Sequence, residues 1–177
     1  MSLLRQMPES LSDGVVLLDA HRIEDAETHL HGEDAEMRRR FDAQRPATLD
    51  ETRRAIERWI AGRAGGEPMF AYALRNLSGL LIGGCELRIR SADSASISYW
   101  VFPRFRGRGH AVRMVDLLYA AARQVSGIRR LELRVSADNQ QSRRVAEKAG
   151  FIETGTVEEK TLTGTVSTML LYVKDLL

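Results

Sequence analysis

Residues 99–111 read Tyr99-Trp100-Val101-Phe102-Pro103-Arg104-Phe105-Arg106-Gly107-Arg108-Gly109-His110-Ala111. They join a strand to a helix, because alternating apolar residues precede them from residue 94 and an amphipathic run follows to about residue 125. Pro103 cannot donate a ladder hydrogen bond, so strand pairing should loosen at this end. Two glycines one residue apart let the turn point successive backbone N–H groups into one concavity at a helix N-terminus. The turn is therefore a predicted anion site that suits a pyrophosphate.

Three arginines of this turn, Arg104, Arg106 and Arg108, can add charge-assisted contacts to bound phosphates. A P-loop is excluded because it requires a lysine after its last glycine, and no lysine lies near this turn. A dinucleotide fingerprint requires a third glycine, but Val112 occupies that position. RNA-binding arginine-glycine tracts are disordered repeats, whereas this stretch is a single copy between periodic elements.

Outward from the turn, strands and helices alternate in a way that predicts one α+β domain. The expected strands are 15–19, 69–75, 80–90, 94–101, 131–135, 151–157 and 166–173. The expected helices are modest turns within 21–36, a helix from the Thr48/Glu51 capping box to Gly65-Gly66, one over 109–125, and a short one from Asp138 or Asn139 to Gly150. We expect a mixed, mostly antiparallel central sheet with helices on both faces.

Side-chain periodicity predicts which faces of these elements are buried. Ile56, Trp59 and Ile60 should lie on one apolar face of the helix after the capping box. In the strand over 80–90, we expect an apolar face made by Leu81, Cys85, Leu87 and Ile89.

The chain has 177 residues, 44% hydrophobic and 28% charged, as is typical of one globular domain. We expect a single domain over residues 14–177 and an N-terminal extension over residues 1–13. No apolar run is long enough to span a bilayer, and residues 1–13 lack the apolar region of a signal peptide. We therefore expect a cytoplasmic protein with no membrane partner. The net charge of +2 gives no argument for nucleic-acid binding.

Cys85 is the only cysteine, which excludes an internal disulfide and a cysteine-rich zinc site. We interpret it as a small buried apolar residue. His29 and His31 are two residues apart, a spacing that can chelate a metal, but no cysteine or carboxylate pattern nearby completes a site. No metal is expected.

Asn139 and Ser142 share one face of the predicted short helix with Val145, Ala146 and Ala149. An amide and a hydroxyl that point from a helix N-terminus toward the sheet can bind an amide-containing arm and protonate its end. Asn139 is also a good N-cap residue, and Ser142 can equally be a satisfied buried serine. Both residues are candidates for ligand binding.

The pattern Arg104-x-x-Gly107-x-Gly109-x-Ala111, followed by Asn139-x-x-Ser142 and Lys148-Ala149-Gly150-Phe151, resembles the GNAT superfamily of acetyl-CoA-dependent N-acetyltransferases. Tyr99-Trp100-Val101 and the outline of the N-terminal third resemble the ribosomal-protein N-terminal acetyltransferases of the RimJ/RimL kind. The resemblance extends over about residues 15–173. Each motif alone is only moderately specific for the family, but the order and spacing of the motifs together are strong evidence for the resemblance.

The resemblance implies that acetyl-CoA binds with its pyrophosphate on the amides of residues 106–111 and its pantetheine arm beside Val101. It implies that Asn139 holds the pantetheine and that Ser142 protonates the leaving thiolate. Whether the protein forms a homodimer is left open by the sequence. The implied cofactor-binding residues are Val101, Arg104, Arg106, Gly107, Arg108, Gly109, His110, Ala111, Asn139 and Ser142.

The sequence departs from the family pattern where a base and an acid are expected. Ser96 stands where relatives often carry a strand glutamate, and Ala146 stands where many carry a tyrosine one turn after Ser142. We therefore expect Glu86, on the neighbouring strand, to be the replacement base, directly or through a water. The alternative for Glu86 is an ion pair with Arg88 or Arg90 that has no catalytic role. His110 titrates near neutral pH but is expected at the pyrophosphate end.

The expected function is transfer of an acetyl group from acetyl-CoA directly to a primary amine. The RimJ/RimL resemblance favours the N-terminal α-amine of a protein or peptide as acceptor. Two alternatives stay open. One is acetylation of a small amine such as an aminoglycoside or polyamine, which an acidic pocket would favour. The other is an acetyl-CoA-binding module without turnover, since the usual base and tyrosine are missing.

Overall fold

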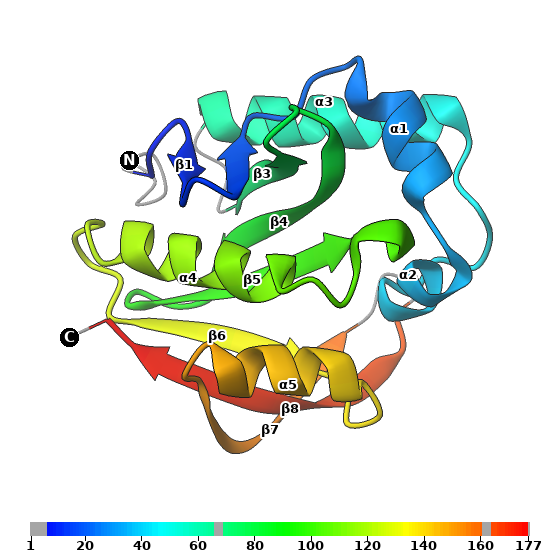
Figure 1. Ribbon diagram of the computed structural model, residues 1–177. Helices are drawn as coiled ribbons and strands as arrows, with labels where there is room; N and C mark the ends of the chain where they lie inside the picture. Colours follow the sequence, from blue (N-terminus) through cyan, green and yellow to red (C-terminus); the bar gives the residue numbers. More distant parts are fainter. Residues whose placement is uncertain (1–6, 66–68, 161–163, 177) are drawn as a thin grey trace.

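The computed structural model describes residues 7–65, 69–160 and 164–176, which form one sheet and two groups of helices (Figure 1). The helices are α1 (Asp25–Gly32), α2 (Ala35–Arg40), α3 (Leu49–Gly65), α4 (His110–Ala122) and α5 (Gln140–Lys148), with a 3-10 turn at Pro103–Phe105. The strands are β1 (Leu11–Ser12), β2 (Val16–Asp19), β3 (Met69–Asn76), β4 (Leu81–Ile89), β5 (Ser94–Val101), β6 (Arg130–Val135), β7 (Ile152–Lys160) and β8 (Val166–Asp175).

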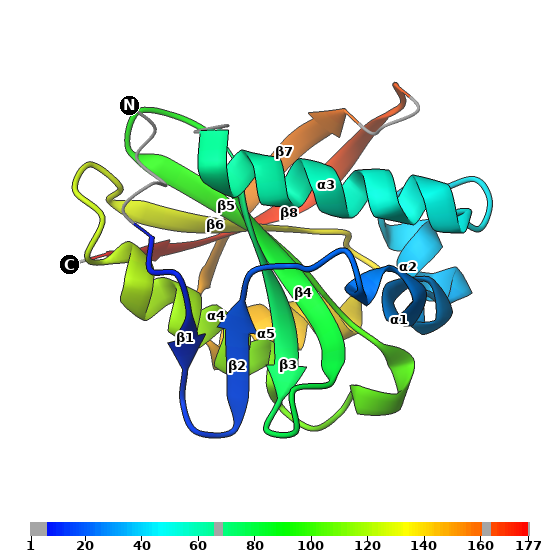
Figure 2. The ribbon, with the colours of Figure 1, turned by 90° about the horizontal axis from the view of Figure 1, so that it is seen from above.

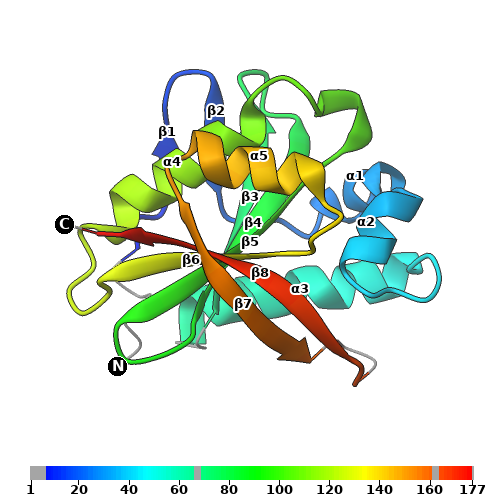
Figure 3. The same ribbon diagram turned by 90° about the horizontal axis from the view of Figure 1, so that it is seen from below.

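The sheet has the order β1-β2-β3-β4-β5-β6-β8-β7. Its neighbours are antiparallel except β5 and β6, which are parallel. Figures 2 and 3 show α3 on one face of the sheet and α4 and α5 on the other. The expected mixed, mostly antiparallel sheet with helices on both faces is confirmed.

Alternation along the strands builds a core on each face. Tyr72 and Leu74 join the main core with Met114 and Leu118 of α4. Ala73, between them, joins a smaller cluster on the α3 face with Trp100. Cys85 is fully buried in the main core, as expected.

The capping box of α3 forms as predicted. Glu51 accepts from the Thr48 backbone N–H at 2.8 Å, and Thr48 Oγ1 accepts from the Glu51 N–H at 3.3 Å. Ile56 is fully buried, but Ile60 is 37% exposed. The apolar face of α3 is therefore buried over only part of its width.

A β-bulge changes the predicted faces of β4. Leu74 pairs with Gly83 and Arg75 pairs with Leu81, so Ile82 is the extra residue. Ile82 consequently points into the main core, and Leu81 lies in the cluster on the α3 face. The prediction that Leu81 shares a face with Cys85 was wrong, because a bulge shifts the alternation by one residue.

Residues 7–13, which we assigned to an extension, pack against the domain. Leu11 and Ser12 form β1 and pair with β2. Met7 is buried in the main core, and the Tyr72 hydroxyl donates to the Pro8 carbonyl at 2.6 Å. Residues 1–6 lie outside the described part of the chain. Within the described part, no helix combines the length and apolarity needed to cross a membrane.

Candidate active site

The site lies where β5 and β6 separate. These strands pair only through Ser94↔Arg130, Ala95↔Leu131 and Ser96↔Glu132. Residues 97–101 pair with β4 alone, and Figure 1 shows β5 and β6 diverging toward α2. A cleft of about 410 Å³ occupies this opening and is lined from β5, α2, the turn before α4, and α5. The loosening expected near Pro103 therefore begins earlier, after Ser96.

The glycine turn forms one end of this cleft. Gly107 and Gly109 have φ of +74° and +79°, and a Cβ built on either would meet nothing within 4 Å. The first hydrogen bond of α4 runs from the Arg113 N–H to the Gly109 carbonyl at 3.1 Å. The N–H groups of His110, Ala111 and Val112 thus have no partner within the helix. They border an open space and suit an anion.

The arginines of the turn divide into two kinds. The Arg106 guanidinium forms two bonds with the Asp34 carboxylate, at 2.7 and 2.9 Å, and its Nε donates to the Val101 carbonyl at 2.9 Å. Arg106 therefore ties the turn to α2, which differs from the expected phosphate contact. Arg104 and Arg108 are exposed. They are the charged side chains of the turn that remain accessible to an anion.

His110 begins α4 at the edge of the cleft. Burial, followed by the charges of Arg108 and Arg113, lowers its pKa. Its Nδ1 is buried without a hydrogen-bond partner among the described residues. A neutral imidazole at this position adds no charge to the turn, so the arginines supply its positive charge.

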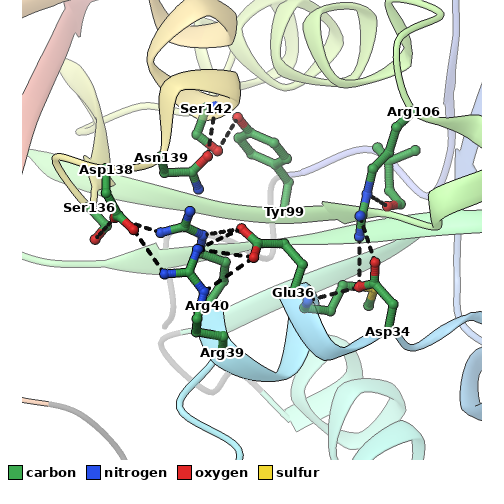
Figure 4. Close-up of polar contacts among 12 residues, drawn as sticks. Asp34, Glu36, Arg39, Arg40, Tyr99, Arg106, Ser136, Asp138, Asn139 and Ser142 are labelled. Carbon is green, nitrogen blue, oxygen red and sulfur yellow. Dashed lines mark hydrogen bonds and ion pairs between the residues drawn. The ribbon is translucent and has the colours of Figure 1, made fainter.

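The N-terminus of α5 forms the opposite wall. Asn139 is its N-cap, and Asn139 Oδ1 accepts from the Ser142 backbone N–H at 3.1 Å. The Asn139 NH2 group makes none of the hydrogen bonds found among the described residues. The Ser142 hydroxyl accepts a hydrogen bond from Tyr99 of β5 at 3.1 Å (Figure 4). An amide donor and a hydroxyl thus line the cleft together, as the shared helix face predicted.

Helix α2 connects the two sides of the opening between β5 and β6. The sequence did not predict this position of α2. Asp34 caps α2 through the Met37 N–H at 2.9 Å and joins it to the glycine turn through Arg106. On the other side, Arg39 and Arg40 reach Asp138 at 2.9 and 2.7 Å, beside the start of α5. Figure 4 shows both connections. The cleft therefore runs beneath α2.

Glu86 lies outside the residues that line this cleft. Its Oε1 accepts from the Trp59 indole N–H at 2.5 Å, and its Oε2 lies 3.5 Å from Arg88. Its side chain is 18% exposed. These contacts hold Glu86 on the α3 face of the sheet. In the ladder, Glu86 pairs with Ser98 and is therefore one residue pair away from Tyr99.

Two histidines and two tryptophans pack together on this same face. The His21 ring stacks on Trp59 with centroids 4.4 Å apart, and Trp59 stacks on Trp100 at 5.3 Å. Burial lowers the pKa of His21 to about 3 and that of His29 to about 4. Neither ring has a hydrogen-bond partner in the described chain. His29 and His31 belong to no group of three or more metal-binding side chains there.

Several side chains that line the cleft were not predicted as site residues: Met37 on α2, Phe41 at its C-terminal cap, Tyr99 on β5, and Gln141, Arg144 and Lys148 on α5. The sequence analysis identified Tyr99 as a strand residue and as part of a family motif, and Lys148 as part of another, but it assigned neither side chain to the site. Arg144 and Lys148 lie two and six residues after Ser142, and a search for exposed cations along α5 would have found them. The α2 residues carry no comparable signal.

Comparison with known proteins assigns the fold to a family. The chain matches the acetyltransferase (GNAT) domain family over residues 16–152. A 64-residue stretch is 41% identical to the uncharacterized N-acetyltransferase YycN of Bacillus subtilis (strain 168). That stretch covers 36% of this chain and only 40% of YycN, so it compares parts of the two proteins.

Solved structures share the whole fold at low identity. A putative ribosomal-protein-serine acetyltransferase from Vibrio cholerae has a TM-score of 0.79 and 14% identity, with 94% of this chain and 97% of that chain covered. RimJ of Mycobacterium smegmatis, in complex with CoA-disulfide, has a TM-score of 0.76 and 20% identity, with 96% and 86% covered. An aminoglycoside acetyltransferase in complex with coenzyme A has a TM-score of 0.73 and 18% identity, with 90% and 94% covered. On the family match and this shared fold, the chain belongs to the GNAT acetyltransferase family.

Proposed function

We propose that this protein transfers an acetyl group from acetyl-CoA to the α-amine at the N-terminus of a protein or peptide. The observation that carries the proposal is the opening between β5 and β6, where a glycine turn and the start of α5 border one cleft. A long donor with a phosphate end and an amide-containing arm matches the two kinds of groups found there. The family match and the CoA complexes of related folds support the choice of donor.

The described residues fit this donor. The open N–H groups of His110, Ala111 and Val112 would hold the pyrophosphate, with Arg104 and Arg108 nearby. The Asn139 NH2 group would bind an amide of the arm. The donor supplies an activated acyl group, and the protein orients it against the amine.

Two protein groups would move protons. We assign protonation of the leaving sulfur to Ser142, whose hydroxyl lines the cleft. We assign deprotonation of the amine to Glu86, whose carboxylate lies beside the ladder position of Ser98. Because this carboxylate lies outside the cleft, the proton would reach it through a bridging water.

The charge of the cleft suits the anionic donor. Glu36 is the only carboxylate among the cleft-lining residues of the described chain, and Arg40 pairs with it at 2.7 Å. Arg144 and Lys148 line the same cleft and can contact the donor's phosphates. The α-amine acceptor is supported by the resemblance of Tyr99-Trp100-Val101 to the RimJ/RimL kind and by the fold shared with RimJ.

The test is a screen for CoA release with acetyl-CoA and three acceptor sets: peptides with free N-termini, aminoglycosides and polyamines. Release with peptides alone is the expected result. Release with polycations alone overturns the acceptor assignment. Binding of acetyl-CoA without release in any set identifies a binding module instead of an enzyme.

A second experiment tests the donor site. Acetyl-CoA should raise the melting temperature of the wild type, because it binds only the native state. The Gly107→Val/Gly109→Val double variant should lose this shift. Gly79→Val is the matched control, since Gly79 has the same positive φ of +80° and equal open space but does not line the cleft. An undiminished shift in the double variant contradicts the assigned phosphate site.

A further inference from the structure

Tyr99 and Ser142 form a hydrogen-bonded pair across the open end of the sheet. The Tyr99 hydroxyl, on β5, donates to Ser142 Oγ, on α5, over 3.1 Å (Figure 4). Tyr99 lies three residues beyond Ser96, the last β5 residue that pairs with β6. Both side chains line the cleft. The two hydroxyls therefore meet inside the space that an acyl donor would enter.

The contacts of this pair determine where its hydrogens point. Burial raises the pKa of Tyr99 to about 12, so the phenol keeps its proton at neutral pH. A serine hydroxyl has one hydrogen, and Ser142 Oγ already accepts from Tyr99, so that hydrogen can point elsewhere. The bond from the Ser142 N–H to Asn139 Oδ1 fixes the serine on the first turn of α5. The Ser142 hydrogen is thus available to a group in the cleft.

We propose that Tyr99 supplies the proton that Ser142 passes to the leaving sulfur. The thioester C–S bond breaks with its electron pair on sulfur, which takes the Ser142 proton while Ser142 Oγ takes the Tyr99 proton. The amine gives one proton through a water to Glu86 as its C–N bond forms, Glu86 releases that proton to solvent, and solvent returns one to Tyr99, so the protons balance. Tyr99 acts through Ser142 and is a positioning residue. The proposal rests on the proposed function.

Ser142 needs such a partner because a serine alone is a weak acid. A bare alkoxide left in a partly buried cleft would be costly, and simultaneous protonation by a phenol lowers that cost because a phenolate is a much weaker base than an alkoxide. One helical turn after Ser142, where a phenol on the same helix would reach this point, stands Ala146, which is fully buried. In this chain the phenol comes from the sheet instead of from the helix.

The kinetic test compares Tyr99→Phe, Ser142→Ala and the double variant, using acetyl-CoA and the peptide acceptor found by the screen. Tyr99→Phe should lower kcat about 10-fold, with the KM for acetyl-CoA unchanged. The double variant should be no slower than Ser142→Ala, because the two residues act as one unit. Tyr119→Phe is the matched control: Tyr119 lies on α4, outside the cleft lining, and its hydroxyl donates to the Asp175 carbonyl. It should retain full kcat.

A selenium donor separates proton supply from packing. In acetyl-seleno-CoA the leaving group is a weaker base and departs without a proton. Tyr99→Phe should therefore match the wild type within about 2-fold with this donor, since general acid catalysis contributes little to a good leaving group. An equal loss with both donors, additive losses in the double variant, or full kcat of Tyr99→Phe with acetyl-CoA each overturns the proposal.

A binding measurement gives a readout without turnover. The thiol of bound CoA can be titrated through its ultraviolet thiolate absorbance. Loss of the Ser142 donor should raise its pKa by about one unit, and Tyr99→Phe should raise it by a smaller amount. An unchanged value in both variants contradicts the pair. A wild type that releases no CoA with any amine overturns the proposed function itself, whereas an active wild type with an equally active Tyr99→Phe overturns only the role of Tyr99.

Discussion

The strongest stability prediction concerns His29, whose ring is enclosed by aromatic side chains on the α3 face. Its centroid lies 5.5 Å from that of Trp59 and 5.7 Å from that of Phe102. Burial lowers its pKa from 6.5 to about 4, and neither ring nitrogen has a partner among the described residues. Replacement by phenylalanine keeps a planar ring of similar size and removes the titration.

The sign follows from proton binding in the two states. Between about pH 6.5 and pH 4, the unfolded chain binds a proton on His29 that the folded chain does not bind. The contribution of His29 to stability is therefore complete above the unfolded pKa and falls as the pH drops toward the folded pKa. For these two pKa values, the loss between pH 8 and pH 5 is about 2 kcal/mol.

The assay is urea unfolding of the wild type and His29→Phe at both pH values. The wild type should lose about 2 kcal/mol more than the variant on acidification, whatever the variant's stability at pH 8. His31→Gln is the matched control, because His31 is exposed on the same helix, and it should retain the wild-type dependence. An equal pH dependence of His29→Phe and the wild type would refute the reasoning.

Three further predictions concern the cleft. Asn139→Ala should cost about 1 kcal/mol in urea unfolding through loss of the α5 cap and should weaken acetyl-CoA binding measured by calorimetry. Asn139→Asp should keep the cap and still weaken binding; equal affinity of Asn139→Asp and the wild type would contradict a role for the amide. Asp34→Ala should cost about 1 to 2 kcal/mol, because the α2 cap and the Arg106 pair are lost together; unfolding at the wild-type urea midpoint would count against the bridge. Glu86→Gln should lower turnover by roughly 100-fold, because it removes the base and keeps the side-chain size; an unchanged rate would show that solvent removes the proton.

The parts of the fold that local patterns specify were predictable. The alternation of apolar residues along β5 predicts the strand, and the apolar stripe along α4 predicts the helix. The positive φ of Gly107 and Gly109 explains why the turn that joins β5 to α4 needs glycine. The helix begins at His110, one residue after the expected start at Gly109, and ends at Ala122 although Val125 is buried. The spacing of apolar side chains indicates which residues are buried, and buried residues continue after the last turn of α4. The spacing therefore does not mark where the helix ends.

The parts that depend on distant residues were not predictable. Helix α2 has six residues and ends in three consecutive arginines, so no apolar stripe marks it. Its position comes from ion pairs with Arg106 and Asp138, each roughly 70 to 100 residues away in the chain. The Tyr99 contact with Ser142 likewise depends on how far β5 and β6 separate, which neither strand reveals alone. The glycine turn at one end of the cleft was predictable from the sequence, and α2, which lies over the cleft, was not.

The separation of β5 from β6 also determines how the backbone exchanges its amide hydrogens. Along residues 97–101, successive amides point alternately toward β4 and toward the cleft. Those facing β4 are held in a ladder and exchange only when the sheet opens, whereas those facing the cleft have no strand to protect them. Free protein should therefore show fast and slow amides alternating within one strand. A ligand arm that pairs with this edge would slow only the fast set, so the occupancy of the cleft can be followed without any substitution.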